Sequence, residues 1–376
     1  MLKLGRRTRT VVLGSTVALL AALPATTSLT GMHMAVPHSL FAGFANRTIA
    51  PVTAANGDAN PYSIAVVPQT AGSLTQGNVL VVDFNNSKGM SGAGMSIVQV
   101  DPTTGTSSTF YSNPSITGPV GIAINASNDI VWVAYWGTAA NGSGSGYAVI
   151  SPTGQLLANF TNQTASFNGM HNLFEGSWGA AFAPGAFFWT NVNASNSGRD
   201  GQVWRLNPNP TGRHNGQPLN STYTPLVTNL PTNSAVHGGE NPSNAAGPQG
   251  MVYDPRNGIL YVADDANNTI YAIPNALTAT GPVTPIVVSS GGALHAPQNL
   301  ALDPENGDLL VVNGAINNDI VEISTYSNRQ LALRPLRAGA PGALFGLAAT
   351  KNARNQLVVY YDDANNATLR ALMPRH

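Results

Sequence analysis

The hydrophobic positions of this chain repeat in a unit of four short strands. Each unit opens with a turn residue, followed by a small apolar strand that resembles Gly-[Ile/Met/Leu]-Ala-[Ile/Leu/Val]. A turn then leads to a second strand rich in Val and Tyr, and a polar turn, a third strand and a fourth strand complete the unit. Self-similarity at such a period is typical of propellers and other repeat folds. The unit starts at Pro61, Pro119, Ser177, Pro248, Pro297 and Leu344.

The spacing of these starts separates the repeat from its insertions. Successive starts lie 58, 58, 71, 49 and 47 residues apart, and the last two intervals are near the period of a four-stranded propeller blade. The longer intervals indicate inserted loops. The pattern predicts an all-β protein, a six-bladed β-propeller with four antiparallel strands per blade.

Blades four and five show the repeat most clearly. The sequence Asp-Pro-Arg-Asn-Gly at 254–258 returns as Asp-Pro-Glu-Asn-Gly at 303–307. Proline presets φ at the second position of a turn, and glycine supplies the positive φ at its end. The same turn therefore joins the first two strands of both blades, and residues 265–271 have a near copy at 363–369.

The second and third strands of blade four carry a family signature. The run Tyr261-Val262-Ala263-Asp264, followed by Asn267-Asn268-Thr269-Ile270, resembles the NHL repeat, whose blades carry Val-Ala-Asp and then Asn-x-x-Ile. The resemblance extends from about residue 60 to the C-terminus and is weak in blades one to three. Thr269 stands where the family usually has an arginine. The resemblance implies the six-bladed propeller of the NHL family.

The sixth repeat ends before its fourth strand. Segment Ala45–Val52, just before blade one, can supply that strand. This pairing would join the two ends of the chain and leave no open ring with exposed strand edges. We therefore expect a signal peptide at 1–28, a flexible segment at 29–44 and the propeller at 45–376.

The first residues have the pattern of an export signal. Four basic residues between positions 3 and 9 precede an uncharged apolar stretch, Val11–Leu23, and small residues follow at 24–28. The stretch is short for a membrane-spanning helix, which needs roughly 20 residues. We expect a secreted or periplasmic protein without an integral membrane span after signal cleavage, the alternative being an uncleaved anchor.

Composition narrows the functional classes. Charged residues form 9% of the chain and the net charge is zero, whereas ordinary globular domains contain about 25% charged residues. A basic patch for nucleic acid is absent, and the lack of cysteine excludes disulfides and thiolate sites. We expect a monomer. The low charge fits either a turn-rich exported β-protein or service in acid, because acid denaturation draws mainly on ionised carboxylates.

Loop insertions are predicted on one face of the propeller, over blades one to four. Long loops on a rigid scaffold commonly carry binding sites, although drift in Gly- and Ser-rich loops gives the same pattern. Three insertions lie between strands two and three, and two lie in the links into blades three and four. They are Asn85–Gly94, Gly137–Gly146, Asn193–Gly201, Thr161–Gly176 and Thr228–Gly247.

Three histidines precede the first strands of blades three, four and five. His171, His237 and His295 could meet at the mouth of the central channel, and three imidazoles suffice for a catalytic zinc. This arrangement resembles the zinc site of the amidating lyase that shares the NHL fold. In that lyase, however, the ligand histidines directly follow the blade-opening proline. Gln249 and Gln298 occupy that position here, so ordinary loop histidines are the alternative.

A second resemblance is to gluconolactonase-like propellers. The sequence Glu175-Gly176-Ser177-Trp178 is similar to their Glu-Gly-Pro-x-Trp start, although it lacks the proline and lies in the third blade. Such an enzyme would need oxygen ligands around calcium or a similar ion. The nearest candidates end the second strands of their blades, where capping of the next turn is the alternative role. These candidates are Asp83, Asp264 and Asn313.

These observations favour a non-catalytic binding or scaffold protein that uses the loops of one face. Its partner would be an extracellular ligand, either a protein or a saccharide, and no cofactor is expected. The alternative is a metal-dependent hydrolase or lyase with a divalent cation, calcium or zinc, at the channel mouth. Candidate ligand-binding residues are His171, Glu175, Trp178, His237, Gln249, His295 and Gln298.

Overall fold

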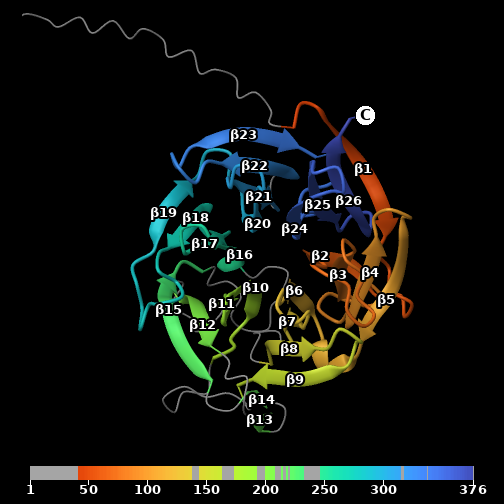
Figure 1. Cartoon of the computed structure of the whole chain (residues 1–376), viewed down its shortest axis with the longest axis horizontal. Coiled ribbons are helices and arrows are strands. Elements are labelled where there is room, and N and C mark those ends of the chain that lie inside the picture. The colour runs from red at the N-terminus through yellow and green to blue at the C-terminus, as the bar shows by residue number, and fades with distance from the viewer. Residues whose placement is uncertain are drawn as a thin grey trace, which may run out of the picture. The chain divides into compact units, whose positions relative to one another are not determined.

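The six predicted blades are arranged in a ring (Figure 1), and the innermost strands of all six line a cavity in the central channel. The computed structural model describes residues 41–137, 144–162, 173–192, 200–207, 213–214, 217–218, 221–232, 246–314, 317–336 and 338–375. Within them, each blade is a four-stranded antiparallel sheet. The predicted all-β, six-bladed propeller is therefore confirmed.

In the first three blades, successive strands run from the channel outward. Blade one holds β2 (Ala59–Val66), β3 (Val79–Asn85), β4 (Ser96–Asp101) and β5 (Thr106–Ser112). Blade two holds β6 (Pro119–Ile124), β7 (Val131–Tyr135), β8 (Gly146–Ile150) and β9 (Leu156–Thr161). Blade three holds β10 (Ser177–Ala183), β11 (Ala186–Asn191), β12 (Gly201–Asn207) and β15 (Thr222–Leu230).

Blades four and five repeat the same order, and blade six takes its outer strand from the N-terminal part of the chain. Blade four holds β16 (Pro248–Asp254), β17 (Ile259–Asp264), β18 (Thr269–Ile273) and β19 (Ile286–Ser290). Blade five holds β20 (Pro297–Leu302), β21 (Leu309–Asn313), β22 (Asp319–Ile323) and β23 (Gln330–Pro335). Blade six holds β24 (Leu347–Lys351), β25 (Leu357–Asp363), β26 (Thr368–Pro374) and β1 (Phe44–Pro51).

Two small elements complete the described structure. A short hairpin of β13 (Arg213–His214) and β14 (Gln217–Pro218) lies in the connection from β12 to β15. One 3₁₀ turn, η1 (Pro114–Ile116), precedes β6, and Asn113 caps it by accepting a hydrogen bond from the backbone N–H of Ser115. Within the described part of the chain, no helix has the length and hydrophobicity that crossing a membrane requires.

The middle strands of the blades are buried on both faces. Every residue of β7, β8, β18, β21 and β22 is buried. Neighbouring blades cover the two faces of each sheet, so apolar residues do not alternate with polar ones along these strands. The apolar clusters consequently extend across adjacent blades, and burial between sheets holds the ring together.

The glycine of the opening strand allows adjacent blades to approach closely. A Cβ atom added to Gly121 would collide with the carbonyl oxygen of Trp178, and one added to Gly179 would collide with that of Gln249. In each case the obstructing carbonyl belongs to the innermost strand of the next blade. The glycine is thus required by close approach of two backbones around the channel.

The repeated Asp-Pro-x-Asn-Gly turn has the predicted geometry in both blades. Gly258 and Gly307 have φ values of +73° and +79°, and each donates its backbone N–H to the carbonyl oxygen of the turn's aspartate. The aspartate side chains, Asp254 and Asp303, also accept from the N–H two residues later, at 3.0 and 2.7 Å. The conserved shape of the turn therefore follows from local hydrogen bonds.

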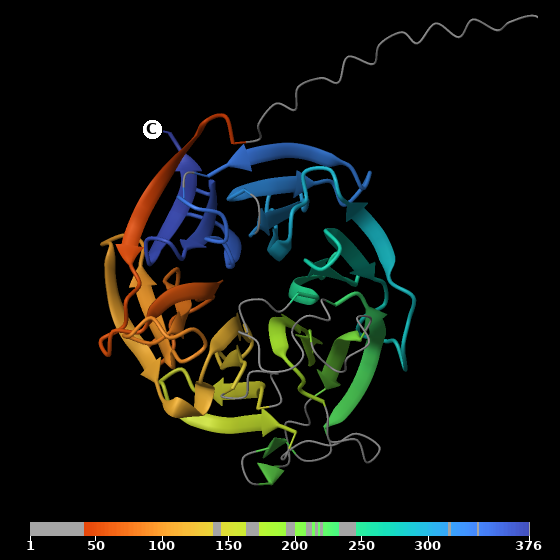
Figure 2. The ribbon, with the colours of Figure 1, turned by 180° about the vertical axis from the view of Figure 1, so that it is seen from behind.

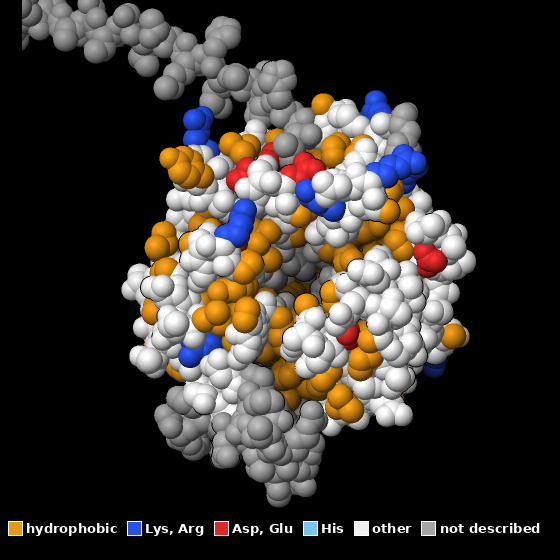
Figure 3. Space-filling model, in the orientation of Figure 1, with side chains coloured by type: hydrophobic (Ala, Val, Ile, Leu, Met, Phe, Trp, Pro, Cys, Tyr) orange, Lys and Arg blue, Asp and Glu red, His pale blue; other side chains and the backbone are white. Residues whose placement is uncertain are grey.

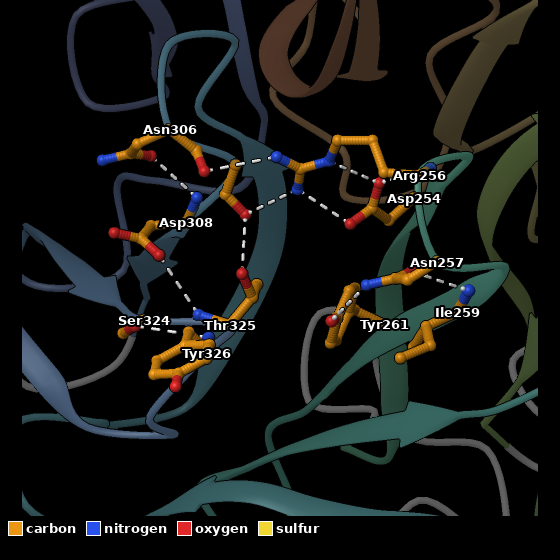
Figure 4. Close-up of polar contacts among 11 residues, drawn as sticks. Asp254, Arg256, Asn257, Ile259, Tyr261, Asn306, Asp308, Ser324, Thr325 and Tyr326 are labelled. Carbon is orange, nitrogen blue, oxygen red and sulfur yellow. Dashed lines mark hydrogen bonds and ion pairs between the residues drawn. The ribbon is translucent and has the colours of Figure 1, made fainter.

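Arg256 joins the turn of blade four to the turn of blade five (Figure 4). It forms an ion pair of 2.8 Å with Asp254 and donates to the carbonyl oxygens of Asn306 and Gly307, at 3.2 and 3.0 Å. Charge-assisted bonds of this kind are stronger than neutral ones. The arginine therefore adds a polar contact to the apolar packing between these two blades.

β1 lies along the outside of blade six, where Figure 2 shows it beside the C-terminal strands. It pairs antiparallel with β26, from Phe44 opposite Pro374 to Pro51 opposite Thr368. The described chain thus begins and ends in the same sheet. The predicted signal peptide, 1–28, lies outside the described residues, as does most of the segment predicted at 29–44.

Candidate functional site at the mouth of the central channel

The central channel contains a cavity of about 390 Å³. The innermost strands of all six blades line it with mainly apolar side chains, and none of the described lining residues is charged. Figure 3 shows the hollow at the centre of one face, bordered by hydrophobic side chains. Representative lining residues are Ile64, Ile122, Ala180, Met251, Leu300 and Leu347.

The channel wall also offers backbone hydrogen-bonding groups. Each innermost strand lies at the end of its sheet, so only one of its two edges pairs with another strand. The other edge presents N–H and C=O groups that have no ladder partner. An uncharged molecule that combines apolar surface with hydrogen-bonding groups would therefore match this wall.

One position in each blade forms a collar where the innermost strand begins. We define the collar as the residue after the blade-opening position. Three blades contribute an aromatic residue, one contributes valine, and blades four and five contribute carboxamides. The collar residues are Tyr62, Val120, Trp178, Gln249, Gln298 and Phe345, and all except Gln249 line the cavity.

The aromatic side of the collar is packed internally. The ring of Tyr62 is stacked between those of Phe84 and Phe345, with centroid distances of 4.1 and 4.0 Å. Trp178 lies 5.9 Å from Tyr62 and packs edge-on against Trp136 at 5.8 Å. Trp178 is 4% exposed, so this predicted ligand-binding residue belongs to the blade core and also borders the cavity.

The carboxamide side of the collar is organised by Asp265, which the sequence analysis did not single out. Its Oδ2 atom accepts hydrogen bonds from Nε2 of Gln249 and Nε2 of Gln298, at 2.8 and 2.9 Å. Its Oδ1 atom accepts from the backbone N–H of Gly247 at 2.6 Å. Burial raises the pKa of Asp265 to about 7, against these hydrogen bonds, which lower it. One carboxylate thus brings two predicted site residues together.

The other predicted site residues have different surroundings. His295 is partly buried, and its backbone N–H donates to Oδ1 of Asn313 at 3.0 Å. Glu175 accepts from Nδ2 of Asn162 at 3.1 Å, and burial raises its pKa to about 7. His171 and His237 lie outside the described residues, so the convergence of three histidines stays a prediction.

The polar residues that end the second strands have three different roles. Asp264 accepts from the backbone N–H of Ala266 at 3.1 Å, which is the expected turn cap. Asn313 instead donates to the carbonyl oxygen of Ala293 and to Oδ1 of Asp319, at 2.6 and 2.7 Å. Asp83 is fully buried, and neither of its carboxylate oxygens has a hydrogen-bond partner among the described residues.

The described residues do not assemble a metal cage. Across the described ranges, no three His, Asp or Glu side chains are placed to hold a metal ion. Neighbouring carboxylates nevertheless change the pKa of one buried acid. Burial, and then the charges of Asp58 and Asp362, raise the pKa of Asp83 well above its usual value.

Of the five predicted loop insertions, only Asn85–Gly94 lies wholly within the described residues. Oδ1 of Asn86 accepts from the backbone N–H groups of Lys88 and Met90, both at 3.0 Å. Gly94 donates its N–H to the carbonyl oxygen of Phe84 at 2.8 Å. This insertion is a turn with its own hydrogen bonds; the other four extend beyond the described ranges.

Comparison with known proteins supports the fold. No family model matches the chain, and no curated protein matches it in sequence. Among solved structures, a gluconolactonase from Xanthomonas campestris is 14% identical, with a TM-score of 0.55 over 89% of this chain and 91% of that one. A calcium-binding protein, regucalcin, from Agrobacterium tumefaciens is 13% identical, with a TM-score of 0.55 over 88% of this chain and 96% of that one.

A streptogramin B lyase is also similar, with 13% identity and a TM-score of 0.52 over 88% of this chain and 98% of that one. At such identities the likeness concerns the propeller fold, which hosts many unrelated functions. Membership of the NHL-repeat family stays a prediction. The chemistry of this chain must therefore be argued from its own channel mouth.

Proposed function

We propose that the protein is an exported, non-catalytic binding protein that takes a small uncharged molecule into the mouth of its central channel. The observation that carries this proposal is the cavity itself. Its described lining comes from all six blades and contains no charged residue, and carboxamides border it on one side.

The size and polarity of the cavity support an uncharged ligand. A volume of about 390 Å³ lies within the range of small-molecule sites, roughly 300–1,000 Å³. A charged group moved into an apolar site loses its hydration and needs an ionic partner. The lining, as far as the structure describes it, offers no such partner, whereas its backbone edges and carboxamides can satisfy neutral polar groups.

Thermal-shift screening of the mature protein against uncharged metabolites would test the proposal. A variant with a filled channel, Ala180→Phe, separates channel binding from surface binding, because Ala180 lines the cavity. The matched control is Ala55→Phe at an exposed position. Loss of ligand binding in the first variant alone supports the proposal. Binding that survives Ala180→Phe, or failure of every uncharged class to bind, overturns it.

A second candidate function, a metal-dependent hydrolase or lyase, is favoured by Asp83. This fully buried carboxylate has no hydrogen-bond partner among the described residues and lies within range of the charges of Asp58 and Asp362. A cation would supply the missing partner. Elemental analysis before and after dialysis against a chelator decides: stoichiometric metal that Asp83→Asn abolishes supports this function, and metal-free protein of unchanged fold rejects it.

A further inference from the structure

We propose that Gln298 is the specificity-determining residue of the channel mouth and that Asp265 is its positioning residue. Together they select an uncharged, hydroxyl-rich molecule, a sugar or another polyol, over its carboxylate counterpart. This inference rests on the proposed function and names its ligand class.

The contacts of Gln298 fix the orientation of its carboxamide. Its Nε2 atom donates to Oδ2 of Asp265 at 2.9 Å and to the carbonyl oxygen of Ala296 at 3.4 Å. A carbonyl oxygen and a carboxylate can only accept, so the nitrogen must face them. Both amide hydrogens are then engaged, so Oε1 is the group that Gln298 retains to accept a hydrogen bond from a ligand in the cavity that it lines.

Asp265 holds this arrangement from a fixed position. The backbone N–H of Gly247 anchors one of its oxygens, and the other oxygen receives both Gln249 and Gln298. The carboxylate therefore ties the collar residues of blades four and five together before any ligand arrives. Preorganised polar groups of this kind contribute to affinity because little freedom is lost on binding.

Backbone strain beside Gln298 is an independent sign of a functional position. Ala296 has a φ of +49°, in the left-handed region that residues with a side chain rarely adopt. Its N–H donates to Oδ1 of Asn268 at 2.6 Å, and its carbonyl oxygen receives Gln298. Strained residues that their surroundings hold in place cluster at binding sites.

Asn299 supplies the complementary group. It follows Gln298 in β20 and also lines the cavity, and its Oδ1 accepts from the backbone N–H of Leu300 at 2.8 Å. Its Nδ2 group is then the donor left for a ligand. An acceptor and a donor on neighbouring residues suit a hydroxyl group, which both donates and accepts.

A carboxylate would be rejected at the same place. It carries only acceptors, so it cannot bond to Oε1 of Gln298, and its charge would face the buried carboxylate of Asp265. Among the described residues that line the cavity, none is cationic to compensate. Galactose and galacturonate, which differ by one carboxylate, are therefore a suitable probe pair.

The experiment measures binding of galactose and galacturonate by titration calorimetry, within a panel of neutral sugars, polyols and uncharged aromatic compounds. We expect at least one neutral sugar or polyol to bind. Its carboxylate counterpart should bind at least about tenfold more weakly. Gln298→Leu should lower the neutral affinity about tenfold and reduce the discrimination, to which Asp265 still contributes. Asp265→Asn should have a smaller effect in the same direction.

Two further measurements separate positioning from structure. Asp265→Asn added to Gln298→Leu should cost no further affinity, because Asp265 acts through Gln298. In protein labelled with ¹⁵N-glutamine, the Gln298 side-chain amide signal should shift on sugar addition and on Asp265→Asn. The matched controls are Gln69→Leu and Asp129→Asn, which break another carboxamide–carboxylate pair of 2.6 Å whose residues do not line the cavity.

The outcomes distinguish this inference from the proposed function. If galacturonate binds as well as galactose, if Gln298→Leu binds sugars like the native protein, or if only non-hydroxylated molecules enter the channel, the inference is wrong and the channel remains a binding site. If no uncharged molecule of any class binds, both are wrong.

Discussion

The phenolic hydroxyl of Tyr361 in β25 donates a hydrogen bond of 2.5 Å to Oδ1 of Asn46 in β1. The two residues are 315 positions apart, and the bond lies in the sheet where the two ends of the described chain pair. The contact joins the N-terminal strand to a strand that is itself buried within blade six.

Removal of the N-terminal strand should destabilise the whole ring. Deletion of residues up to Pro51 exposes the edge of β26, uncovers apolar residues such as Leu369 and Leu372, and leaves a strand edge open for aggregation. Thermal unfolding should lose its single cooperative transition.

Asn46→Ala should lower the free energy of unfolding by about 1 kcal/mol, the usual net value of one hydrogen bond. Asn229→Ala, at an exposed position of an outer strand, should leave it unchanged.

Substitution of a glycine in an opening strand should be far more damaging than substitution of a loop glycine. In Gly179→Ala the new methyl group meets the carbonyl oxygen of Gln249 and lies 3.0 Å from Oγ1 of Thr190. Neither backbone can move without disturbing its blade, so we expect a loss of about 3 kcal/mol in urea unfolding. Gly281→Ala, with no atom within 4 Å of the new Cβ, is the control. Equal losses in both would contradict the close-approach argument.

Much of the fold could be predicted from the sequence because its determinants are local. The Asp-Pro-x-Asn-Gly turns close through bonds within five residues, as Gly258 and Asp254 show. The glycine of the opening strand has the same role in blades two and three, where Gly121 and Gly179 each lie against a carbonyl oxygen of the next blade. Local rules of this kind survive in a single sequence even where the repeat is degenerate.

Asp265 could not be found in this way, because its partners Gln249 and Gln298 are 16 and 33 residues away and lie in two blades. In the sequence it occupies the same repeat position as Asp363, but the structure gives the two residues different roles. Asp363 forms an ion pair of 3.2 Å with Arg370, whereas Asp265 binds two carboxamides. Repeats therefore predict where a residue lies in its blade, but they do not predict which distant side chains it contacts.

Ala296→Gly should stabilise the protein. The left-handed conformation costs a residue with a side chain about 1–2 kcal/mol, and glycine removes this cost. Glycine also makes the unfolded chain more flexible, which offsets part of the stabilisation. A net increase of about 0.5–1 kcal/mol in the free energy of unfolding is expected. Ala301→Gly, in ordinary strand conformation within β20, should instead destabilise. If both changes destabilise, the strain assigned to Ala296 is wrong.

Stability should rise as the pH falls from 8 toward 5. Burial raises the pKa of Asp264 and Asp362 to about 8, and that of Asp265 and Glu322 to about 7. Because unfolded carboxyls titrate near pH 4, the folded state binds more protons between about pH 4 and pH 8. The free energy of unfolding therefore decreases as the pH rises through that window, opposite to the usual behaviour of ion-paired carboxylates.

Urea unfolding at intervals from pH 4 to pH 8 measures this dependence. In thermal unfolding, the melting temperature should be at least about 5 °C higher at pH 5 than at pH 8. Asp362→Asn removes one of the buried acids and should flatten the curve. Asp101→Asn is the control, because a hydrogen bond from the backbone N–H of Thr103 lowers the pKa of this partly exposed carboxyl. It is ionised in both states above pH 5 and contributes no slope there. Loss of the fold near pH 4 would exclude service in acid, whereas a maximum on the acid side would connect the low charge of the chain to its buried carboxyls.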